Sequence, residues 1–506
     1  MSAPATSSQS TYGQVLKSSA LVGGSSLVNI FASIVRVKAM AVLLGPAGFG
    51  LMGLLVSISE LTRSLAGLGV NSSGVRQIAA AVGTGDTQRI ALTAAVLRRV
   101  SFVLATLGAV TLIVFARPIA QLSFGHTAYA GAVALLSLEV FLRIVGDGQG
   151  ALLAGFRRIA DMVRAAILGA IGGTAATVVL VYFFRESGIV PALITVAAMS
   201  LVFTWAYSRR VSLEPVSPTL TAVRTESFEL LKLGLAFMTS GLVVMGVGYV
   251  IRIVVLRALG IEAAGFYQSA WSLGGLYVGF VLQAMGADFY PRLTAVAYNN
   301  AECNRLVNEQ TEVGLLLAGP GVLGTLVFAP LVVWLFYSPE FAEAVPLLRW
   351  FCIGMMVRVI CWPLGFVLMA KNLRHAFVGA DVFWALSNLA LSTVLVWTVG
   401  LAGAGIAFIL AYVLYTLLVR YLVSRASGFT WSQSSRRLIA LFVLSVLASL
   451  TFSVILPPLV SLAVNSLLVV AAGYYSARSL IRLLPWERLP GPVRWLARRL
   501  WLAPAA

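Results

Sequence analysis

The chain has 506 residues, of which 59% are hydrophobic and only 11% are charged, and its mean hydropathy is +0.94. A soluble protein of this length needs a polar surface that such a composition cannot supply, so the composition excludes an ordinary soluble domain. The formal net charge of +18 raises the question of nucleic-acid binding, which the placement of the basic residues, described below, argues against.

The length of the apolar stretches distinguishes the two architectures that span a membrane. In lipid, every backbone polar group must be satisfied within a helix or a closed barrel. The stretches here run to about 20 residues or more, which suits a spanning helix and is about twice the length of a barrel strand. The sequence therefore predicts an all-α polytopic membrane protein with about fourteen transmembrane helices. In chain order, we place them at 16–44, 49–72, 91–115, 129–156, 162–184, 188–208, 229–258, 264–288, 311–337, 345–370, 375–399, 401–423, 435–457 and 459–482.

The two ends and the loops predict the orientation. Residues 1–14 are polar and uncharged and lack the basic region and cleavage site of a signal peptide, so we expect a cytoplasmic tail. With the N-terminus inside, 26 of the 36 basic residues fall in cytoplasmic loops and at the two ends, whereas the external loops at 338–344, 400 and 458 have none. This asymmetry predicts that both termini are cytoplasmic. The positive charge then reflects topology and contact with anionic lipid, and nucleic acid is not an expected partner.

A faint internal repeat relates the two halves of the chain. Four features of the first half recur in order about 216 residues later, and a fifth match joins two mid-span arginines. The matches are Arg36 with Arg252, Gly45 with Gly260, Gly48-Phe49 with Gly265-Phe266, Arg76 with Arg292, and Arg143 with Arg358. Six helices in each half give both lobes the same orientation, related by a pseudo-twofold axis along the membrane normal.

The repeat predicts the domain organisation. Two six-helix lobes are joined by a cytoplasmic linker and followed by two extra helices. The last segment interleaves tryptophan with arginine, a composition typical of a membrane-surface anchor. The expected parts are an N-terminal tail at 1–14, an N-lobe at 15–210, a linker at 211–228, a C-lobe at 229–424, two extra helices at 435–482 and a basic tail at 483–506.

Charged residues inside the predicted spans indicate function, because a central charge costs about 2.5–3.5 kcal/mol even on the lenient insertion scale. Glu139, Arg143 and Asp147 are spaced i, i+4, i+8 on one stripe, and Glu60 stands three residues before Arg63. Local pairing is the structural interpretation of both groups. The functional interpretation is that carboxylates around an arginine bind a coupling ion. Glu139, Asp147 and Glu60 are accordingly our candidates for coupling to H⁺ or Na⁺, and no other cofactor is expected.

The mid-span basic residues predict an anionic guest. Arginine stays protonated and binds phosphate through two parallel hydrogen bonds. If the repeat brings its arginines together, they line one cavity for a phosphate or pyrophosphate. The alternative is that Arg36 and Lys38 snorkel to the external interface. The predicted substrate-binding residues are Arg36, Lys38, Arg143, Arg252 and Arg358.

The sequence shows no arrangement of residues that is typical of catalysis or metal binding. His126 and His375 lie in predicted loops on opposite sides of the membrane. No phosphate-binding loop, metal-ligand spacing or nucleophile triad is present in the sequence. We therefore expect neither a catalytic residue nor a metal site, and we expect a transporter rather than an enzyme.

Residues 27–82 carry a family resemblance. The stretch from Lys38 to Gly50, KAMAVLLGPAGFG, has a basic residue seven positions before Gly-Pro-x-Gly-Φ-Gly. It resembles the first span of Wzx-type polysaccharide flippases of the multidrug/oligosaccharidyl-lipid/polysaccharide exporter superfamily. Leu65–Arg76, Gly155-Phe156-Arg157 and Phe289–Leu293 are similar to further family positions. The resemblance covers roughly residues 15–425 in helix order, and Lys38 matches the family's basic position.

The resemblance implies two lobes around a cationic cavity that alternates access across a bacterial inner membrane. The expected function is the transfer of an undecaprenyl-pyrophosphate-linked oligosaccharide, for O-antigen, capsule or exopolysaccharide, from the cytoplasmic to the periplasmic leaflet. Such proteins are thought to exchange substrate for H⁺ or Na⁺. The implied partners are the lipid-linked glycan, membrane lipid and polysaccharide polymerase machinery.

Three other functions remain open. The usual polysaccharide flippase has twelve spans, whereas the related lipid II flippase of peptidoglycan synthesis has fourteen. In that flippase the last two helices are implicated in holding the lipid tail, which makes 435–482 a candidate tail groove here. A cation-coupled multidrug exporter shares the fold but requires an acidic cavity. A membrane scaffold or sensor has no need for arginines at mid-depth.

Overall fold

The computed structural model describes residues 7–215, 219–483 and 499, with side chains from residue 28 onward apart from a few positions within helices. Residues 1–6 of the expected N-terminal tail and nearly all of the basic tail lie outside this part of the chain. Within it, the secondary structure is helical throughout. The protein divides into two compact units, Met1–Gly265 with Phe336–Ser338, and Phe266–Leu335 with Pro339–Ala506.

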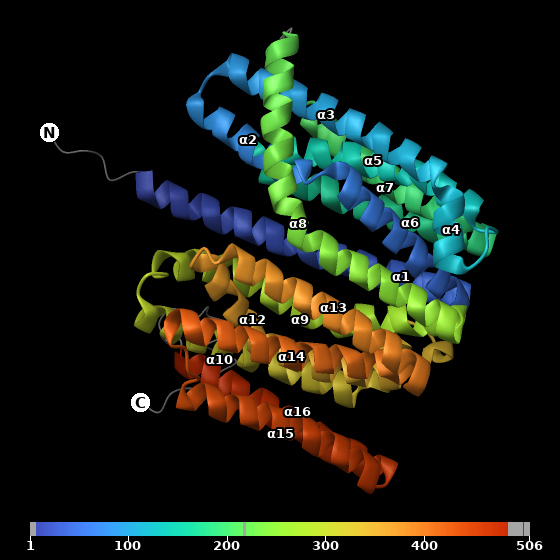
Figure 1. Cartoon of the computed structure of the whole chain (residues 1–506), viewed down its shortest axis with the longest axis vertical. Helices are drawn as coiled ribbons and strands as arrows, with labels where there is room; N and C mark the ends of the chain where they lie inside the picture. The colour runs from blue at the N-terminus through green and yellow to red at the C-terminus, as the bar shows by residue number, and fades with distance from the viewer. Residues whose placement is uncertain (1–6, 216–218, 484–498, 500–506) are drawn as a thin grey trace, which may run out of the picture. The chain divides into compact units, whose positions relative to one another are not determined.

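In the described part of the chain, the first unit contains helices α1 to α8 (Figure 1). α3 packs against α5, α5 against α7, α6 against α7 and against α1, and α8 against α1 and α2. The helices are α1 (Ser7–Gly67), α2 (Val70–Thr84), α3 (Thr87–Val114), α4 (Ala116–Phe124), α5 (Ala130–Gly155), α6 (Ile159–Phe184), α7 (Ile189–Ser208) and α8 (Leu220–Leu259).

Among the described residues, the second unit contains helices α9 to α16. The first five residues of α9 and the last residue of α11 belong to the first unit. α14 packs against both α12 and α13, while α15 and α16 pack against α10. The helices are α9 (Ile261–Ala295), α10 (Asn300–Val327), α11 (Ala329–Phe336), α12 (Ala344–Ala370), α13 (Arg374–Val399), α14 (Leu401–Ser427), α15 (Gln433–Ile455) and α16 (Pro458–Leu483).

Short polar residues and glycines set the helix ends. The Asp86 carboxylate accepts hydrogen bonds from the backbone N–H groups of Gln88 and Arg89 at 2.9 and 3.1 Å, which satisfies free donors at the start of α3. Ser432 does the same for α15 by accepting from the Ser435 N–H at 2.9 Å. Gly428 ends α14 with a φ of 67°, the left-handed conformation that glycine adopts without strain.

The membrane-length helices match the predicted spans. Within the described residues, eleven stretches are long and apolar enough to cross a membrane. Two of them, Val28–Gly67 and Ile159–Ser208, each hold two helical segments, separated at Gly45 and at Arg185–Gly188. α5 is of spanning length but carries three charged residues. Counted this way, the described chain has the fourteen membrane-length segments expected from the sequence.

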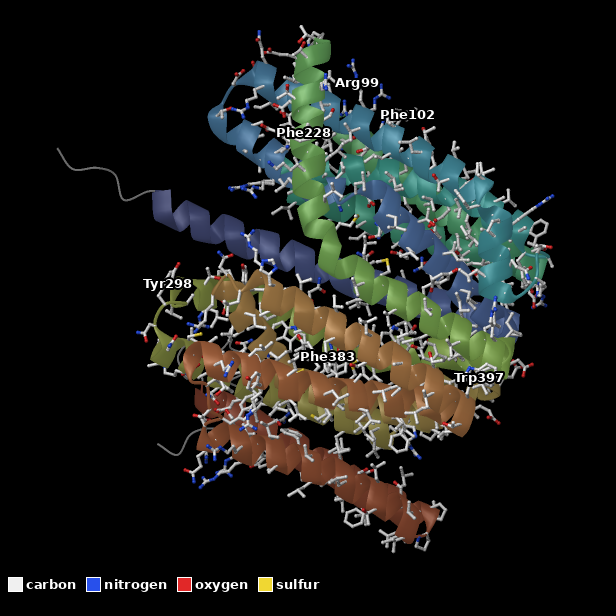
Figure 2. The ribbon with its side chains drawn as sticks, in the orientation of Figure 1. Arg99, Phe102, Phe228, Tyr298, Phe383 and Trp397 are labelled. Atoms are coloured by element: carbon white, nitrogen blue, oxygen red, sulfur yellow. The ribbon has the colours of Figure 1, made fainter. Side chains whose placement is uncertain are left out.

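Apolar side chains cover the outer faces of these helices. Phe102 on α3 is 57% exposed, and Trp397 on α13 is 65% exposed (Figure 2). Exposed aromatic and aliphatic residues in such numbers destabilise a protein in water but match hydrocarbon. The exposed faces therefore agree with a multi-pass membrane protein.

The backbone carries the internal repeat independently of the residue matches. Three pairs of residues with positive φ stand 215 positions apart, each at the boundary of corresponding helices. The pairs are Gly45 with Gly260, Arg157 with Asn372, and Arg185 with Gly400. Positive φ is uncommon outside glycine, so a coincidence of three pairs at one offset supports a repeated structural unit. By this offset Arg143 of α5 corresponds to Arg358 of α12.

The grouping of α8 is the main difference between the compact units and the expected lobes. The sequence places 229–258 at the start of the C-lobe, whereas α8 belongs to the first compact unit. Its contacts with α1, α2, α3 and α4 account for this grouping. The lobes at 15–210 and 229–424 stay predictions about the transport cycle.

Candidate functional site

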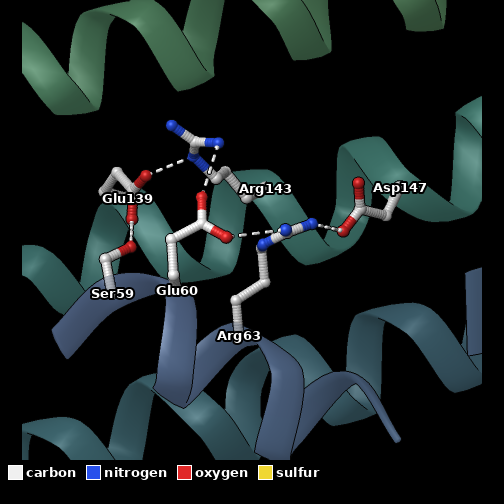
Figure 3. A network of polar contacts seen from close by, with 6 residues as sticks. All are labelled: Ser59, Glu60, Arg63, Glu139, Arg143 and Asp147. Atoms are coloured by element: carbon white, nitrogen blue, oxygen red, sulfur yellow. Dashed lines mark hydrogen bonds and ion pairs between the residues drawn. The ribbon is translucent and has the colours of Figure 1, made fainter. Parts of the chain in front are cut away.

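A network of ion pairs joins the second half of α1 to α5 (Figure 3). At its centre is Arg63 of α1, which makes two ion pairs with separate carboxylates. Its Nη2 lies 2.9 Å from Glu60 Oε2 on the same helix, and its Nη1 lies 2.8 Å from Asp147 Oδ2 on α5. Arg63 therefore links the two helices, and the predicted i, i+3 pair is one part of a larger arrangement.

Arg143 forms the second half of the network. Its Nε donates to Glu139 Oε1 on α5, and its Nη1 lies 3.5 Å from the other oxygen of Glu60 on α1. The second oxygen of Glu139 accepts a hydrogen bond from the Ser59 hydroxyl. Glu60 is thus shared between the two arginines, so a change at Glu60 affects both.

The helix periods explain this arrangement. Residues 139, 143 and 147 occupy one stripe of α5, and residues 59, 60 and 63 lie within one turn of α1. Small residues let the helices approach, as is usual in membrane bundles. A Cβ on Gly108 of α3 would lie 2.6 Å from that of Ala66, and Gly148 of α5 leaves the space that Ser101 of α3 occupies.

Burial differs sharply across the network. The side chain of Glu139 is only 2% exposed, whereas Glu60, Arg63, Arg143 and Asp147 are 28–33% exposed. A buried carboxylate is tolerated only when it is paired and hydrogen-bonded, and both Arg143 and Ser59 supply that compensation. Glu139 therefore has the environment of a structural anchor, while Glu60 and Asp147 are reachable by water or a small cation.

A pocket of about 220 Å³ opens beside this network in the first unit. Arg63 and Asp147 line it, and α2, α3 and α8 complete its walls. Arg63 Nε and Ser101 Oγ are buried without a hydrogen-bond partner among the described residues. Buried polar groups of this kind are normally satisfied by water or a ligand, so the pocket gives Asp147 a polar approach route. Its other polar lining residues are Ser64, Asn71 and Ser72.

The predicted substrate-binding residues occupy different environments. Arg36 of α1 is half-buried. Arg252 of α8 donates from Nη1 to the Gly248 carbonyl at 2.8 Å. Lys38 of α1 is half-buried as well.

Arg358 differs from Arg143 in its partners. It lies on α12 in the second unit, where its Nη1 approaches Met355 Sδ at 3.9 Å, and no carboxylate in the described part of the chain lies within ion-pair distance. Its repeat counterpart Arg143 has two carboxylate partners. The predicted cavity lined by all five basic residues stays a prediction.

Three polar residues of the structure were not among the predicted site residues. Ser59 and Ser101 are ordinary small residues in apolar runs, and only their contacts with Glu139 and the pocket distinguish them. Asp381 of α13, inside a predicted span, accepts a hydrogen bond from the Tyr415 hydroxyl of α14 at 3.5 Å. A charge inside a predicted span was a usable signal for Asp381, whereas nothing in the sequence identifies the two serines.

Comparisons with known proteins agree with this architecture. A lipid III flippase of Escherichia coli (strain K12) is 24% identical over 411 residues, which cover 79% of this chain and 95% of the relative. The structure of the lipid II flippase MurJ in an inward closed conformation aligns with a TM-score of 0.65 and 14% identity, covering 92% of this chain and 99% of that chain. An inward-facing multidrug resistance MATE family transporter of the MOP superfamily aligns with a TM-score of 0.62 and 18% identity over 79% of this chain and 96% of that one.

The structural likenesses show the fold, and a family model identifies the chain more closely. The model described as polysaccharide biosynthesis protein matches residues 39–346. That range begins one residue after Lys38 and therefore includes nearly all of the Lys38–Gly50 stretch. It also includes Glu60, Arg63 and the whole of α5, and so contains the network. Because the match spans more than half of the chain, this protein belongs to the polysaccharide biosynthesis protein family.

Proposed function

We propose that this protein is a flippase that moves a lipid-linked glycan across a bacterial inner membrane. The observation that carries the proposal is Arg358, a guanidinium on a membrane-length helix with no carboxylate partner among the described residues. Such a group is costly in a membrane unless an anion or water compensates it. A phosphate-bearing lipid-linked glycan supplies the anion, and the family and the lipid III flippase relative agree with that class of substrate.

The more specific form of the proposal names an undecaprenyl-pyrophosphate-linked oligosaccharide that moves from the cytoplasmic to the periplasmic leaflet by alternating access. Arg36, Lys38, Arg143, Arg252 and Arg358 contribute the positive field for its pyrophosphate. Transport needs no chemistry on the glycan, so these residues bind and orient the substrate only. The cationic character disfavours a multidrug exporter for cationic drugs, because like charges repel.

The α1–α5 network is the proposed coupling device. With all groups ionised, its three carboxylates and two arginines carry one net negative charge. A proton or Na⁺ on Asp147 removes one partner of Arg63 and leaves that guanidinium held only by Glu60. Since Glu60 also contacts Arg143, the change reaches the second arginine directly. Occupancy of Asp147 thereby biases the distance between α1 and α5, which is the kind of two-state element that coupling requires.

The test is a deletion strain in which surface polysaccharide and pyrophosphate-linked glycan intermediates are quantified together. We expect the surface glycan to disappear and the intermediates to accumulate facing the cytoplasm. Complementation with the Arg358→Ala variant should leave this defect in place, whereas the exposed Arg420→Ala variant on α14 should restore export. Membrane abundance of each variant is measured in parallel. Normal glycan and normal intermediates in the deletion strain would overturn the proposal.

The count of fourteen membrane-length segments favours lipid II transport as a second candidate. The same strain distinguishes the two functions by which intermediate accumulates. A build-up of peptidoglycan precursors with normal surface polysaccharide would assign the protein to lipid II, and the opposite pattern would assign it to the surface glycan.

A further inference from the structure

A second polar pocket, of about 470 Å³, lies in the second unit between the middle of α10, the start of α15 and the end of α16. It is separate from the charge network and uses none of the residues proposed for transport. Its lining residues are Glu312 and Leu316 from α10, Gln433, Ser434, Arg437 and Leu438 from α15, and Tyr475, Ser479 and Arg482 from α16.

The chemistry of this pocket is that of an anion site. Arg437 and Arg482 approach it from two different helices, and neither forms an ion pair within the described part of the chain. Gln433, Ser434 and Ser479 add neutral hydrogen-bond donors. Guanidinium groups on two helices, with hydroxyl and amide donors between them, match the several acceptor oxygens of a phosphate.

The one acidic residue of the pocket is already engaged. Glu312 Oε1 accepts hydrogen bonds from the Ser432 hydroxyl at 2.9 Å and the Ser435 hydroxyl at 2.8 Å, which ties the start of α15 to α10. Two arginines and one carboxylate leave the pocket with one net positive charge. That charge balances a phosphodiester, which carries one negative charge.

The pocket lies at headgroup depth. α15 begins and α16 ends at the pocket, so most of its residues occupy the ends of two membrane-length helices. Glu312 and Leu316 lie near the middle of α10, at the start of the predicted span 311–337. Farther along α15 and α16, apolar side chains face outward, with Leu444 63% exposed and Leu467 70% exposed. A phosphate in the pocket therefore continues into a hydrocarbon-facing surface, an arrangement that fits a lipid and not a free ion.

We propose that this pocket binds the phosphodiester of a bilayer phospholipid, whose acyl chains lie along the exposed faces of α15 and α16. The lipid links α15 to α16 through Arg437 and Arg482. The site goes beyond the proposed flippase function, since it concerns a resident lipid and not the transported one.

The test measures phosphatidylglycerol retained by the purified full-length protein with native mass spectrometry. The Arg437→Gln/Arg482→Gln variant should bind the lipid about tenfold more weakly or worse, because it loses charge-assisted hydrogen bonds from both helices. The matched control is Arg436→Gln/Arg478→Gln, which removes the same charge from adjacent exposed positions outside the pocket and should bind like the wild type. The Arg437→Lys/Arg482→Lys variant should retain part of the binding, and elution volume and thermal unfolding check that all variants fold.

Two outcomes overturn the proposal. Equal lipid loss from the pocket variant and the control would show that the lipid follows overall charge and not this site. Displacement of the lipid by millimolar inorganic phosphate alone would show a free-phosphate site. The Arg358→Ala variant should bind the lipid normally, so failure of the flippase proposal and failure of this one give different results.

Discussion

At the scale of single residues, the carboxylates of the network differ in burial and in the number of their partners. Glu139 is almost fully buried and has two partners, whereas Asp147 has one arginine partner and faces a pocket. The three carboxylates were predicted together as coupling candidates. Their environments favour Asp147 and Glu60 for ion exchange and give Glu139 a supporting role.

Replacing Asp147 with Asn should remove or shift the dependence of transport on pH or Na⁺. The amide keeps the shape of the side chain but cannot take up a proton or hold Arg63 by charge. The measurement is transport rate against pH and Na⁺ concentration in reconstituted vesicles. Asp161→Asn is the control, because Asp161 pairs with Arg158 and Arg164 at the start of α6, outside the network. An unchanged dependence in the Asp147 variant would exclude this residue as the coupling site.

Arg143→Ala should destabilise the first unit by about 1–3 kcal/mol, because it leaves the buried carboxylate of Glu139 without its cation. Adding Glu139→Gln should recover most of that loss, since the amide carries no charge that needs a partner. The double-mutant cycle is read from thermal unfolding in detergent. A substrate-binding role for Arg143 alone predicts no recovery, so additive losses would contradict the pairing.

The sequence predicts which residues form this site better than it predicts the contacts between them. The i, i+4, i+8 spacing puts 139, 143 and 147 on one stripe whatever the tertiary structure. Which helix faces that stripe depends on packing, and no local pattern tells that α1 brings Glu60 and Arg63 to it. Ser59 could not be predicted for the same reason. A serine in an apolar run acquires a role only from the carboxylate that packing places beside it.

At the scale of helices, the breaks in the backbone are as informative as the helices themselves. Gly45 has φ 65° and ψ −174°, and Gly260 has φ 90° and ψ 176°, an extended conformation with positive φ that is essentially restricted to glycine. Each separates two consecutive helical segments of the repeat. The sequence indicated both glycines as matching positions, but their strained geometry was not predictable from spacing alone.

Gly260→Ala should lower the free energy of unfolding by about 1–3 kcal/mol, the cost of a side chain in this backbone conformation. No atom lies within 4 Å of the added Cβ, so a crowding effect is excluded and the loss reports backbone strain alone. Gly279→Ala in α9 is the control, because it also has open space but a helical backbone, and it should be neutral or stabilising. Equal effects at the two positions, read from thermal unfolding, would disprove the strained conformation at 260.

At the scale of the whole chain, hydropathy predicted the spanning segments closely and missed what lies between them. The predicted span 401–423 corresponds to Leu401–Ser427, and 459–482 to Pro458–Leu483. The short helix α4 and the start of α8 at Leu220 were not expected, and the predicted span 311–337 combines the second half of α10 with the separate short helix α11. They are short or polar, and hydropathy reports only the burial of long apolar stretches in lipid.

The positive-inside distribution predicts which loops face the cytoplasm, and this is testable by labelling. A cysteine at Ser187, in the exposed turn between α6 and α7, should react with an impermeant thiol reagent added outside. A cysteine at Thr84, at the exposed end of α2, should react only in inverted vesicles. Native background should be low, because Cys303, Cys352 and Cys361 are all buried. The reverse labelling pattern would invert the proposed orientation.

The network between α1 and α5 also constrains how the protein is made. On the lenient insertion scale, each charge on α5 costs about 2.5–3.5 kcal/mol, so the segment is a poor substrate for a translocon when it arrives alone. Arg63 is synthesised 84 residues before Asp147 and is held in the interval by Glu60 on its own helix. The second half of α1 therefore has to remain near the exit site until α5 emerges and supplies the second carboxylate. Ribosome pausing or truncation between these two helices leaves a nascent chain in which Arg63 has Glu60 but not Asp147 as a partner.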